Sequence, residues 1–219
     1  MTALLRDILA ELLFPWPMNC AVCGEKTEER GMLCRKCRRY LEHQKTRRGF
    51  ANDRNVEDSV SAHRYTGAGG AMVRTLKYRG VSALADTMAK DMIAAAERAG
   101  MEIPDMVTFV PMHLLRRRTR PFNQAELLGR RIAEALGLRQ EKLLRRTRYC
   151  RQQARLRDDR SRRKNVEDAF RATGNLEGRH VMLIDDVCTT GATARECAKA
   201  LRAAGAAKVT LLVYADAGK

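Results

Sequence analysis

Apolar and polar positions along the chain follow two different periods, and these predict its elements. Over residues 3–13 leucine and isoleucine recur at helical spacing, which predicts an amphipathic helix that ends before Pro15 and Pro17. From residue 59 onward, short apolar runs typical of strands alternate with longer stretches of helical periodicity. The expected strands are 60–65, 106–110, 169–172, 181–184 and 209–214, and the expected helices are 71–78, 81–99, 123–136 and 193–204. This alternation predicts an α/β fold, with a parallel sheet covered by helices on both faces.

Two Cys-x-x-Cys pairs lie between the N-terminal helix and the first strand. Cys20 and Cys23 form the first pair, and Cys34 and Cys37 form the second after ten intervening residues. Two such turns place four sulfurs at about 2.3 Å from one Zn²⁺, so we expect a closed, structural zinc site. Two unrelated thiol pairs, or a redox pair, are the alternatives. Whether this module contacts nucleic acid, contacts protein or only braces the next domain stays open.

The chain is strongly basic. Its 219 residues include 42 Lys and Arg against 26 Asp and Glu, a net charge of +16, and 45% are hydrophobic, enough for a folded core. The charge indicates a polyanionic partner: nucleic acid, phosphorylated metabolites, or both. No apolar run approaches the roughly 18–20 residues of a membrane helix, and Asp7 and Glu11 interrupt the N-terminal pattern, unlike a secretory signal. We therefore expect a cytoplasmic protein without membrane insertion, whose cysteines are thiols or metal ligands.

The densest chemical pattern runs from Val181 to Thr193. Four apolar residues predict a buried strand, Asp185 and Asp186 stand at its carboxyl end, and a loop rich in Thr opens a helix. Ligands of open α/β sheets bind at that edge, and the first turn of a helix favours a phosphate. The expected phosphate-binding residues are Thr189, Thr190, Gly191, Ala192 and Thr193. Because the two carboxylates suit ribose hydroxyls or Mg²⁺, the pattern predicts a site for a ribose 5-phosphate.

This thirteen-residue string closely resembles the phosphoribosyl-pyrophosphate (PRPP) signature of type I phosphoribosyltransferases. In that family the two acids contact the ribose hydroxyls and the following loop holds the 5-phosphate, which the resemblance carries over to Asp185, Asp186 and residues 189–193. Cys188 departs from the usual aliphatic residue, but it is small and apolar enough to pack there. Neither the GxGxxG nor the GxxxxGK[ST] pattern of other phosphate sites occurs in the chain.

Two basic segments add positive charge near this pattern. Residues 116–120 read Arg-Arg-Arg-Thr-Arg, and residues 145–164 hold ten basic and two acidic residues, a net charge of +8. A run so one-sided repels itself, which favours a polyanion partner over a merely solvated face. That partner is either pyrophosphate in the same site or a nucleic-acid backbone. Because Tyr149 is the single aromatic residue of the run, nucleic-acid binding is expected to be mainly electrostatic.

The order of motifs along nearly the whole chain resembles the ComF family. The motifs are the four-cysteine module, Leu76–Gly80, Val110-Pro111 with the arginines that follow, Phe122–Ala125, Arg163–Phe170 and the PRPP signature. Pro121 departs from the Gly that is usual before Phe-Asn-Gln, and it fixes the backbone there. The resemblance implies a type I phosphoribosyltransferase fold with a small N-terminal zinc ribbon. We expect the N-terminal helix and ribbon in residues 1–45, a linker in 46–58 and the phosphoribosyltransferase-like domain in 59–219.

The same resemblance implies further site residues and ligands. It implies a pyrophosphate loop at 111–113 and a flexible loop at 148–165 that closes over PRPP. The candidates for contact with pyrophosphate are Lys77, Arg116, Arg118 and Arg120. The implied ligands are PRPP with Mg²⁺, besides the structural Zn²⁺.

Two functions follow, and both stay open at this point. In the first, the chain is a phosphoribosyltransferase that uses PRPP and Mg²⁺, with Asp185 and Asp186 in the catalytic site and an acceptor that the sequence does not identify. In the second, it is a non-catalytic single-stranded-DNA-binding protein in which PRPP is a regulatory ligand. The ComF family is linked to natural competence and the use of imported DNA, so DNA-uptake or competence proteins are plausible partners. Type I relatives often dimerise, which makes a homodimer a further expectation.

Overall fold

A computed structural model gives the fold, and it describes residues 19–27, 32–112, 122–147 and 165–218. The helix expected over residues 3–13 lies outside these ranges. The elements are α2 (Arg35–Glu42), β1 (Arg47–Arg48), β2 (Asp58–Arg64), α3 (Gly67–Arg74), the π-helical turn η1 (Thr75–Arg79), α4 (Leu84–Arg98), β3 (Met106–Phe109), α6 (Gln124–Leu136), β4 (Leu144–Arg146), β5 (Phe170–Ala172), β6 (His180–Cys188), α8 (Ala192–Ala203) and β7 (Lys208–Asp216). Among the described helices, none has the length and apolar character needed to cross a membrane.

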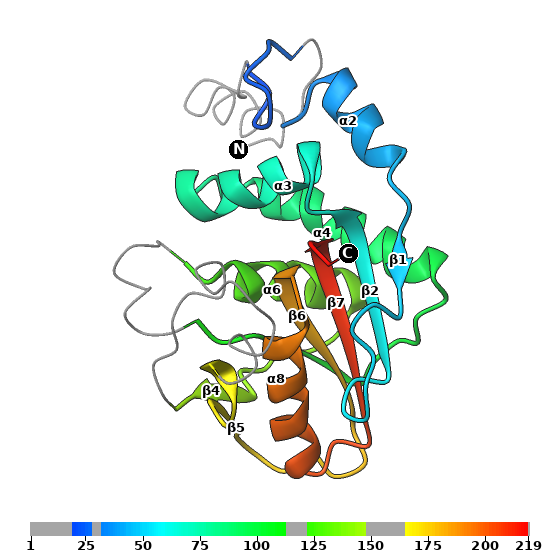
Figure 1. Cartoon of the computed structure of the whole chain (residues 1–219), viewed down its shortest axis with the longest axis vertical. Helices are drawn as coiled ribbons and strands as arrows, with labels where there is room; N and C mark the ends of the chain where they lie inside the picture. The colour runs from blue at the N-terminus through cyan, green and yellow to red at the C-terminus, as the bar shows by residue number, and fades with distance from the viewer. Residues whose placement is uncertain (1–18, 28–31, 113–121, 148–164, 219) are drawn as a thin grey trace, which may run out of the picture.

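A five-stranded sheet in the order β1-β2-β7-β6-β3 forms the centre of the molecule (Figure 1). Four of its strands run parallel, whereas β1 pairs antiparallel with β2 at the edge. Strands β4 and β5 form a separate antiparallel pair. The architecture confirms the α/β class that the alternating periods predict.

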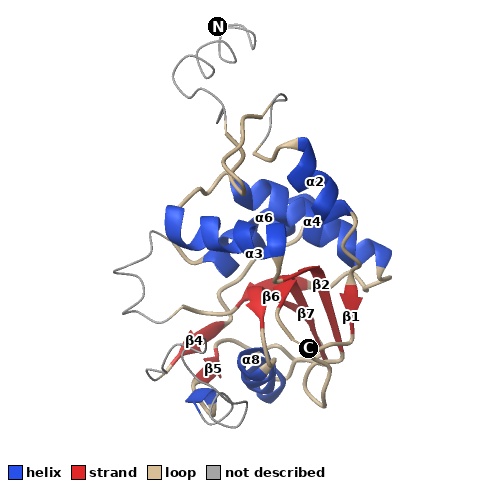
Figure 2. Ribbon diagram, turned by 45° about the horizontal axis from the view of Figure 1, so that its top comes forward, coloured by secondary structure: helices blue, strands red, loops and turns tan. Residues whose placement is uncertain are grey.

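Helices cover both faces of the sheet, as Figure 2 shows: α3, α4 and α6 lie on one side and α8 on the other. The apolar residues of β6 divide between the faces because successive side chains of a strand point in opposite directions. Met182 and Ile184 join the core beneath α4 and α6, whereas Val181 and Leu183 join the core beneath α8. All four are nearly fully buried, so the strand is apolar on both sides, as parallel strands usually are.

Several elements differ from the sequence prediction: α2, β1 and β4 were not predicted, and β6 and α3 have other bounds, for physical reasons. Strand β6 continues through both acids to Cys188, because its register with β7 persists there, whereas the apolar run alone predicts an end at residue 184. Helix α3 begins at Gly67 rather than at residue 71, although glycine disfavours helix. A Cβ on Gly69 would lie 2.4 Å from the backbone oxygen of Arg64, so only glycine allows α3 this close to the end of β2.

The segment expected to be a linker, residues 46–58, packs against the domain that follows it. It contains β1, whose Arg47 and Arg48 pair with β2. Ala51 and Val56 are buried in the core on the α8 side of the sheet. The segment is polar in sequence and gains its structure from the edge of the sheet rather than from its own propensity. The division of the chain into domains remains a prediction.

Candidate functional site

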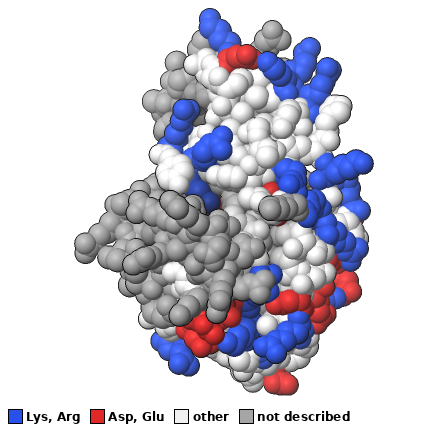
Figure 3. Space-filling view, viewed as in Figure 1, with Lys and Arg blue, Asp and Glu red and all other residues white. Residues whose placement is uncertain are grey.

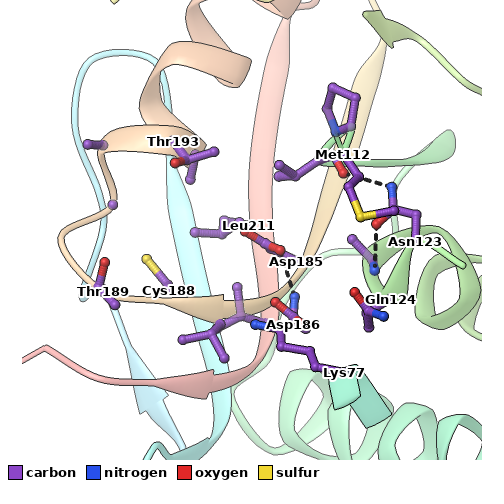
Figure 4. Close-up of a pocket in the computed structure, with 18 of the residues that line it drawn as sticks. Lys77, Met112, Asn123, Gln124, Asp185, Asp186, Cys188, Thr189, Thr193 and Leu211 are labelled. Carbon is purple, nitrogen blue, oxygen red and sulfur yellow. Dashed lines mark hydrogen bonds and ion pairs between the residues drawn. The ribbon is translucent and has the colours of Figure 1, made fainter. Parts of the chain in front are cut away.

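A cavity of about 270 Å³ opens at the carboxyl ends of β3 and β6. One wall comes from η1 and the start of α6, and the opposite wall comes from the loop between β6 and α8 (Figure 4). The polar and glycine residues of its lining that matter below are Lys77, Asn123, Gln124, Arg146, Asp185, Asp186, Thr189, Thr190, Gly191 and Thr193. The structure thus brings together the acid pair, the expected phosphate loop and one expected cation, Lys77.

The two acids lie near the carboxyl end of β6, where the strand still pairs with β7. Asp186 is only 7% exposed, and its backbone N–H donates a 2.8 Å hydrogen bond to Oδ1 of Asp185. Burial, reinforced by the neighbouring Asp186 carboxylate, raises the pKa of Asp185 from 3.8 to about 8. Burial also raises the pKa of the Cys188 thiol to about 12, so Cys188 stays protonated and serves packing. A pair of close carboxylates with one raised pKa is typical of a site that takes a cation or hydroxyl groups.

The raised pKa of Asp185 predicts that the ligand-free protein is less stable at high pH than at low pH. The folded side chain keeps its proton until about pH 8, whereas the unfolded one loses it near pH 4. Between these values the folded state binds more protons, so the unfolding free energy falls as the pH rises through this window. We expect Asp185→Asn, which cannot ionise, to raise the Tm by a few degrees at about pH 9 and hardly at about pH 5. Circular dichroism melts at both pH values check this, and an equal effect at both would contradict it.

Lys77 reaches the acid pair from η1, the π-helical turn after α3. Its Nζ lies 2.8 Å from Oδ2 of Asp186, and the lysine side chain is only 17% exposed. Turns of this kind accommodate one more residue than an α-helical turn and are frequent at functional sites. The turn ends at Gly80, whose φ of 65° lies in the left-handed region that favours glycine. Figure 4 shows Lys77 directed at Asp186 from the helical side of the cavity.

The loop between β6 and α8 forms the opposite wall. Gly191 is the N-cap of α8 with a φ of 73°, and a Cβ there would lie 2.6 Å from Nη1 of Arg195. The Arg195 guanidinium donates a hydrogen bond to the Thr190 carbonyl and so closes the loop upon the helix. The first N–H groups of a helix have no partner within the helix, so this end suits an anion. Arg195 is a bracing residue that the sequence pattern did not single out.

The Phe-Asn-Gln motif connects the start of α6 to the end of β3. Asn123 is the N-cap of α6: its Oδ1 accepts a hydrogen bond from the Ala125 N–H at 3.2 Å, and its Nδ2 donates to the Val110 carbonyl at 3.1 Å. This double contact holds the end of β3, and with it Pro111 and Met112, at the rim of the cavity (Figure 4). The described part of the expected pyrophosphate loop, residues 111 and 112, therefore lines the cavity. Residue 113 of that loop lies outside the described residues.

Arg146 is a cavity residue that the sequence did not single out. It stands opposite Phe170 in the β4–β5 pair, and its guanidinium lies over the Phe170 ring at 5.1 Å. Its Nε is buried without a hydrogen-bond partner. Within the described chain no carboxylate forms an ion pair with it, whereas Lys77 is paired with Asp186. The pairing with Phe170 crosses a long intervening segment, so no local pattern reveals it.

Several expected site residues fall outside the described ranges. Arg116, Arg118 and Arg120 belong to residues 113–121, and most of the expected flexible loop belongs to residues 148–164. Their places relative to the cavity remain predictions.

The four cysteines form a compact cluster at the N-terminal side of the described chain. Their sulfurs all lie within 4.8 Å of one another, and those of Cys23 and Cys34 are 3.6 Å apart. Two sulfurs bound to one tetrahedral Zn²⁺ lie about 3.8 Å apart, given bonds of about 2.3 Å. The Val22 N–H donates to the Cys20 sulfur at 3.4 Å, a contact that supports a thiolate ligand. The donor set and spacing therefore fit a structural zinc ion.

Comparison with known proteins shows to which class of domain the chain belongs. Residues 128–219 match the model of the phosphoribosyl transferase domain, which agrees with the α/β sheet and with a cavity at its carboxyl edge. The chain thus has a phosphoribosyltransferase fold with a four-cysteine module before it. A stretch of 40 residues is also 58% identical to ribose-phosphate pyrophosphokinase 4 of Oryza sativa, covering 18% of this chain and 12% of that protein.

Relatives over nearly the full length define the family. DNA utilization protein YhgH of Salmonella typhimurium is 31% identical over 197 residues, covering 87% of this chain and 86% of the relative. Competence protein F of Haemophilus influenzae is 24% identical over 204 residues, covering 90% of this chain and 82% of that protein. The chain belongs to the ComF family, as the order of its motifs predicts.

Proposed function

We propose that this protein binds PRPP together with Mg²⁺ in the cavity and serves DNA utilisation as a phosphoribosyltransferase-like protein. One observation carries the proposal: the acid pair with Lys77, and the Gly191 loop at the start of α8, face each other across one cavity. The names of the full-length relatives support the biological setting. The match to a ribose-phosphate pyrophosphokinase supports a ribose phosphate as the ligand.

Each part of PRPP has a complementary wall. The 5-phosphate suits the start of α8, where helix N–H groups and threonine hydroxyls gather. The ribose hydroxyls suit Asp185 and Asp186, which accept hydrogen bonds. The diphosphate suits the remaining wall, which consists of the turn at residues 111–112 and the cations Lys77 and Arg146. The cavity thus offers hydrogen-bond donors and positive charge at both ends, where PRPP carries phosphate groups, and carboxylates in the middle, where it carries hydroxyls.

The residues of the cavity also suit transfer chemistry at the anomeric carbon. In such a transfer an acceptor forms a bond to C1 while the bond to diphosphate breaks, and the diphosphate leaves with the electron pair. The chain contributes orientation of the ribose through the acids and cationic stabilisation of the leaving group through Lys77 and Arg146. Mg²⁺, which the carboxylates and the ligand's oxygens suit, supplies further neutralisation of diphosphate charge.

Ligand-induced stabilisation tests the proposal. A ligand that binds only the folded state raises the Tm in proportion to the logarithm of its concentration over its Kd. We expect PRPP with Mg²⁺ to raise the Tm most and ribose 5-phosphate less, because ribose 5-phosphate lacks the diphosphate that Lys77 and Arg146 face. Free ribose should leave the Tm unchanged. If PRPP with Mg²⁺ at millimolar concentration leaves the Tm unchanged, the proposal is wrong.

Arg146→Gln is expected to raise the Kd for PRPP about 10-fold while zinc content and fold stay unchanged. The reason is the loss of one charge-assisted contact, which is worth about 1.5–3 kcal/mol. Arg145→Gln is the matched control, because Arg145 is exposed and the strand pleat directs it to the opposite face of β4. Calorimetric titration of both variants checks the prediction. Equal affinities of the two variants for PRPP would show that Arg146 does not contact the ligand.

A second candidate function, binding of single-stranded DNA, is favoured by the charge on α2. The cluster cysteines Cys34 and Cys37 fix this helix, and its four basic side chains are all exposed: Arg35, Lys36, Arg38 and Arg39. On the face shown in Figure 3, basic side chains gather over α2 and alongside β1. Four basic side chains against one acid, Glu42, on a short helix suit a phosphate backbone, and this surface lies apart from the cavity lining.

Neutralising α2 tests this candidate. We expect the change of all four basic residues of α2 to Gln to weaken binding of a labelled oligothymidylate at low salt. The slope of log K against log salt should fall by up to about 3, since each phosphate contact contributes about 0.7 on single strands. The control carries four Gln at exposed basic positions elsewhere, Lys90, Arg130, Lys142 and Arg179. Fluorescence anisotropy across a salt series measures both, and identical slopes would exclude α2 as the DNA surface.

A further inference from the structure

The cysteine module and the helix that carries Lys77 share one apolar core. Cys20, Met32 and Leu33 of the module belong to the same buried cluster as Met72 and Leu76, at the end of α3 and in η1. Helix α2 also contacts α3, where the Tyr40 ring occupies the space that a Cβ on Gly67 would need. The module therefore packs directly on the segment that leads to the cavity (Figure 1).

A hydrogen bond joins the cysteine cluster to this segment. The Thr75 hydroxyl donates to the Ala21 carbonyl at 3.0 Å, and Ala21 lies inside the first Cys-x-x-Cys turn. The Ala21 N–H in turn donates to the Met32 carbonyl at 2.9 Å, next to the second cysteine pair. Thr75 is only 7% exposed, so its hydroxyl requires a partner within the protein. A change in the cysteine turn consequently changes the environment of a buried side chain on η1.

Thr75 is also the first residue of the π-helical turn that presents Lys77. Only Leu76 separates Thr75, which bonds to the module, from Lys77, whose Nζ lies 2.8 Å from Asp186 Oδ2. A π-helical turn differs from an α-helical turn in its hydrogen-bond register, so a contact with a residue outside the helix can favour one register over the other. The Thr75–Ala21 bond is such a contact at the beginning of the turn, and Gly80 allows the turn to end.

We propose that Thr75 is a positioning residue through which the metal-bound cysteine turn holds η1 with Lys77 directed at the acid pair, so that the cysteine cluster and the cavity stabilise each other's ligands. The inference rests on the proposed binding of PRPP, which it deepens by giving the cysteine module a part in that binding. It has a reciprocal consequence: if bound metal favours PRPP binding, then bound PRPP favours retention of the metal by the same factor. A module that only stabilises the fold predicts that any effect of PRPP on zinc retention is the same in Thr75→Val as in the wild type.

Zinc release provides the test. The full-length, zinc-loaded protein is mixed with an excess of a colour-forming chelator, with and without saturating PRPP and Mg²⁺, and the release rate is followed. We expect PRPP to raise the affinity of the wild type for zinc at least about 5-fold, the lower end of typical coupling between sites, as measured from the zinc left on the protein when the chelator has reached equilibrium. Slower release of zinc should accompany it. In zinc-loaded Thr75→Val we expect PRPP to have little effect on release and the Kd for PRPP to rise several-fold. Thr75→Ser, which keeps the hydroxyl, should restore both.

Thr210→Val is the matched control for the valine change. Thr210 is equally buried, and its hydroxyl lies 3.1 Å from His180 Nε2, at the amino end of the parallel strands. Its valine variant should keep the wild-type response of zinc release to PRPP. If PRPP binds the wild type but leaves the release rate unchanged, the coupling inference alone is wrong. If PRPP does not bind the wild type, the proposed function is wrong and the inference falls with it. Should Thr75→Val not fold, the comparison on the wild type still decides between these results.

Discussion

Asp185→Asn/Asp186→Asn is expected to raise the Kd for PRPP more than about 100-fold. Both side chains are lost as acceptors for ribose hydroxyls and as ligands for Mg²⁺, which Asp185 binds after releasing its proton, and each charge-assisted hydrogen bond is worth about 1.5–3 kcal/mol. The two losses together amount to about 3–6 kcal/mol, which corresponds to a factor of roughly 100 or more in Kd. The change also removes the carboxylate that holds Lys77 at 2.8 Å, so the cation is no longer fixed in the cavity.

Equilibrium dialysis with labelled PRPP measures this effect. Because desolvation raises the pKa of Asp185, its change to Asn should not lower the stability, whereas the change of Asp186 removes the ion pair with Lys77. A Tm within a few degrees of the wild type shows that the variant is folded. The matched control is Asp86→Asn/Glu97→Gln, which removes two exposed acids of α4 and the same charge. Retention of PRPP binding by the acid-pair variant would show that the ligand binds elsewhere.

Cys34→Ser is expected to abolish stoichiometric zinc binding and to unfold the cysteine module. Closed zinc sites of this kind contribute about 10–16 kcal/mol of apparent binding energy in isolated zinc-finger peptides, which is far more than the small apolar core of the module provides. Loss of the metal should expose Met32, Leu33 and Leu41, which are buried against the main domain. The phosphoribosyltransferase fold should persist, because its core beneath α8 contains no residue of the module and most of its core beneath α4 and α6 comes from outside the module.

Metal analysis and limited proteolysis check this prediction together. The wild type should carry one zinc per chain and resist cleavage over residues 19–42, whereas Cys34→Ser should carry none and be cleaved there. Cys197→Ser is the control, because Cys197 is fully buried in α8 on the other side of the sheet. Full zinc content in Cys34→Ser would place the metal on another ligand set.

The parts of the site that are contiguous in sequence could be predicted from it. The strand, the acids, the Gly191 turn and the start of α8 occupy one string, so their relative geometry follows from the strand–loop–helix connection alone. The two cysteine pairs are likewise encoded by short spacings. In both cases local backbone geometry determines which side chains converge.

The rest of the site depends on contacts between distant segments. Lys77 was a candidate for pyrophosphate contact, but nothing near it in sequence indicates that a π-helical turn directs it at Asp186. Arg146 meets Phe170 only because β4 and β5 pair across a long segment. The segment 46–58 reads as a linker because its charged residues lack strand periodicity, yet the free edge of β2 orders Arg47 and Arg48. Each of these three features depends on contacts between distant segments, and no pattern within a single segment reveals such contacts.

Calorimetric titration of PRPP into the zinc-loaded wild-type protein, with and without Mg²⁺, tests the central claim most directly. The structure predicts saturable binding of about one PRPP per chain, weakened without Mg²⁺ and lost in Asp185→Asn/Asp186→Asn. Absence of saturable heat with folded, zinc-loaded wild type would contradict it, and the cavity would then be a feature of the inherited fold without its ligand.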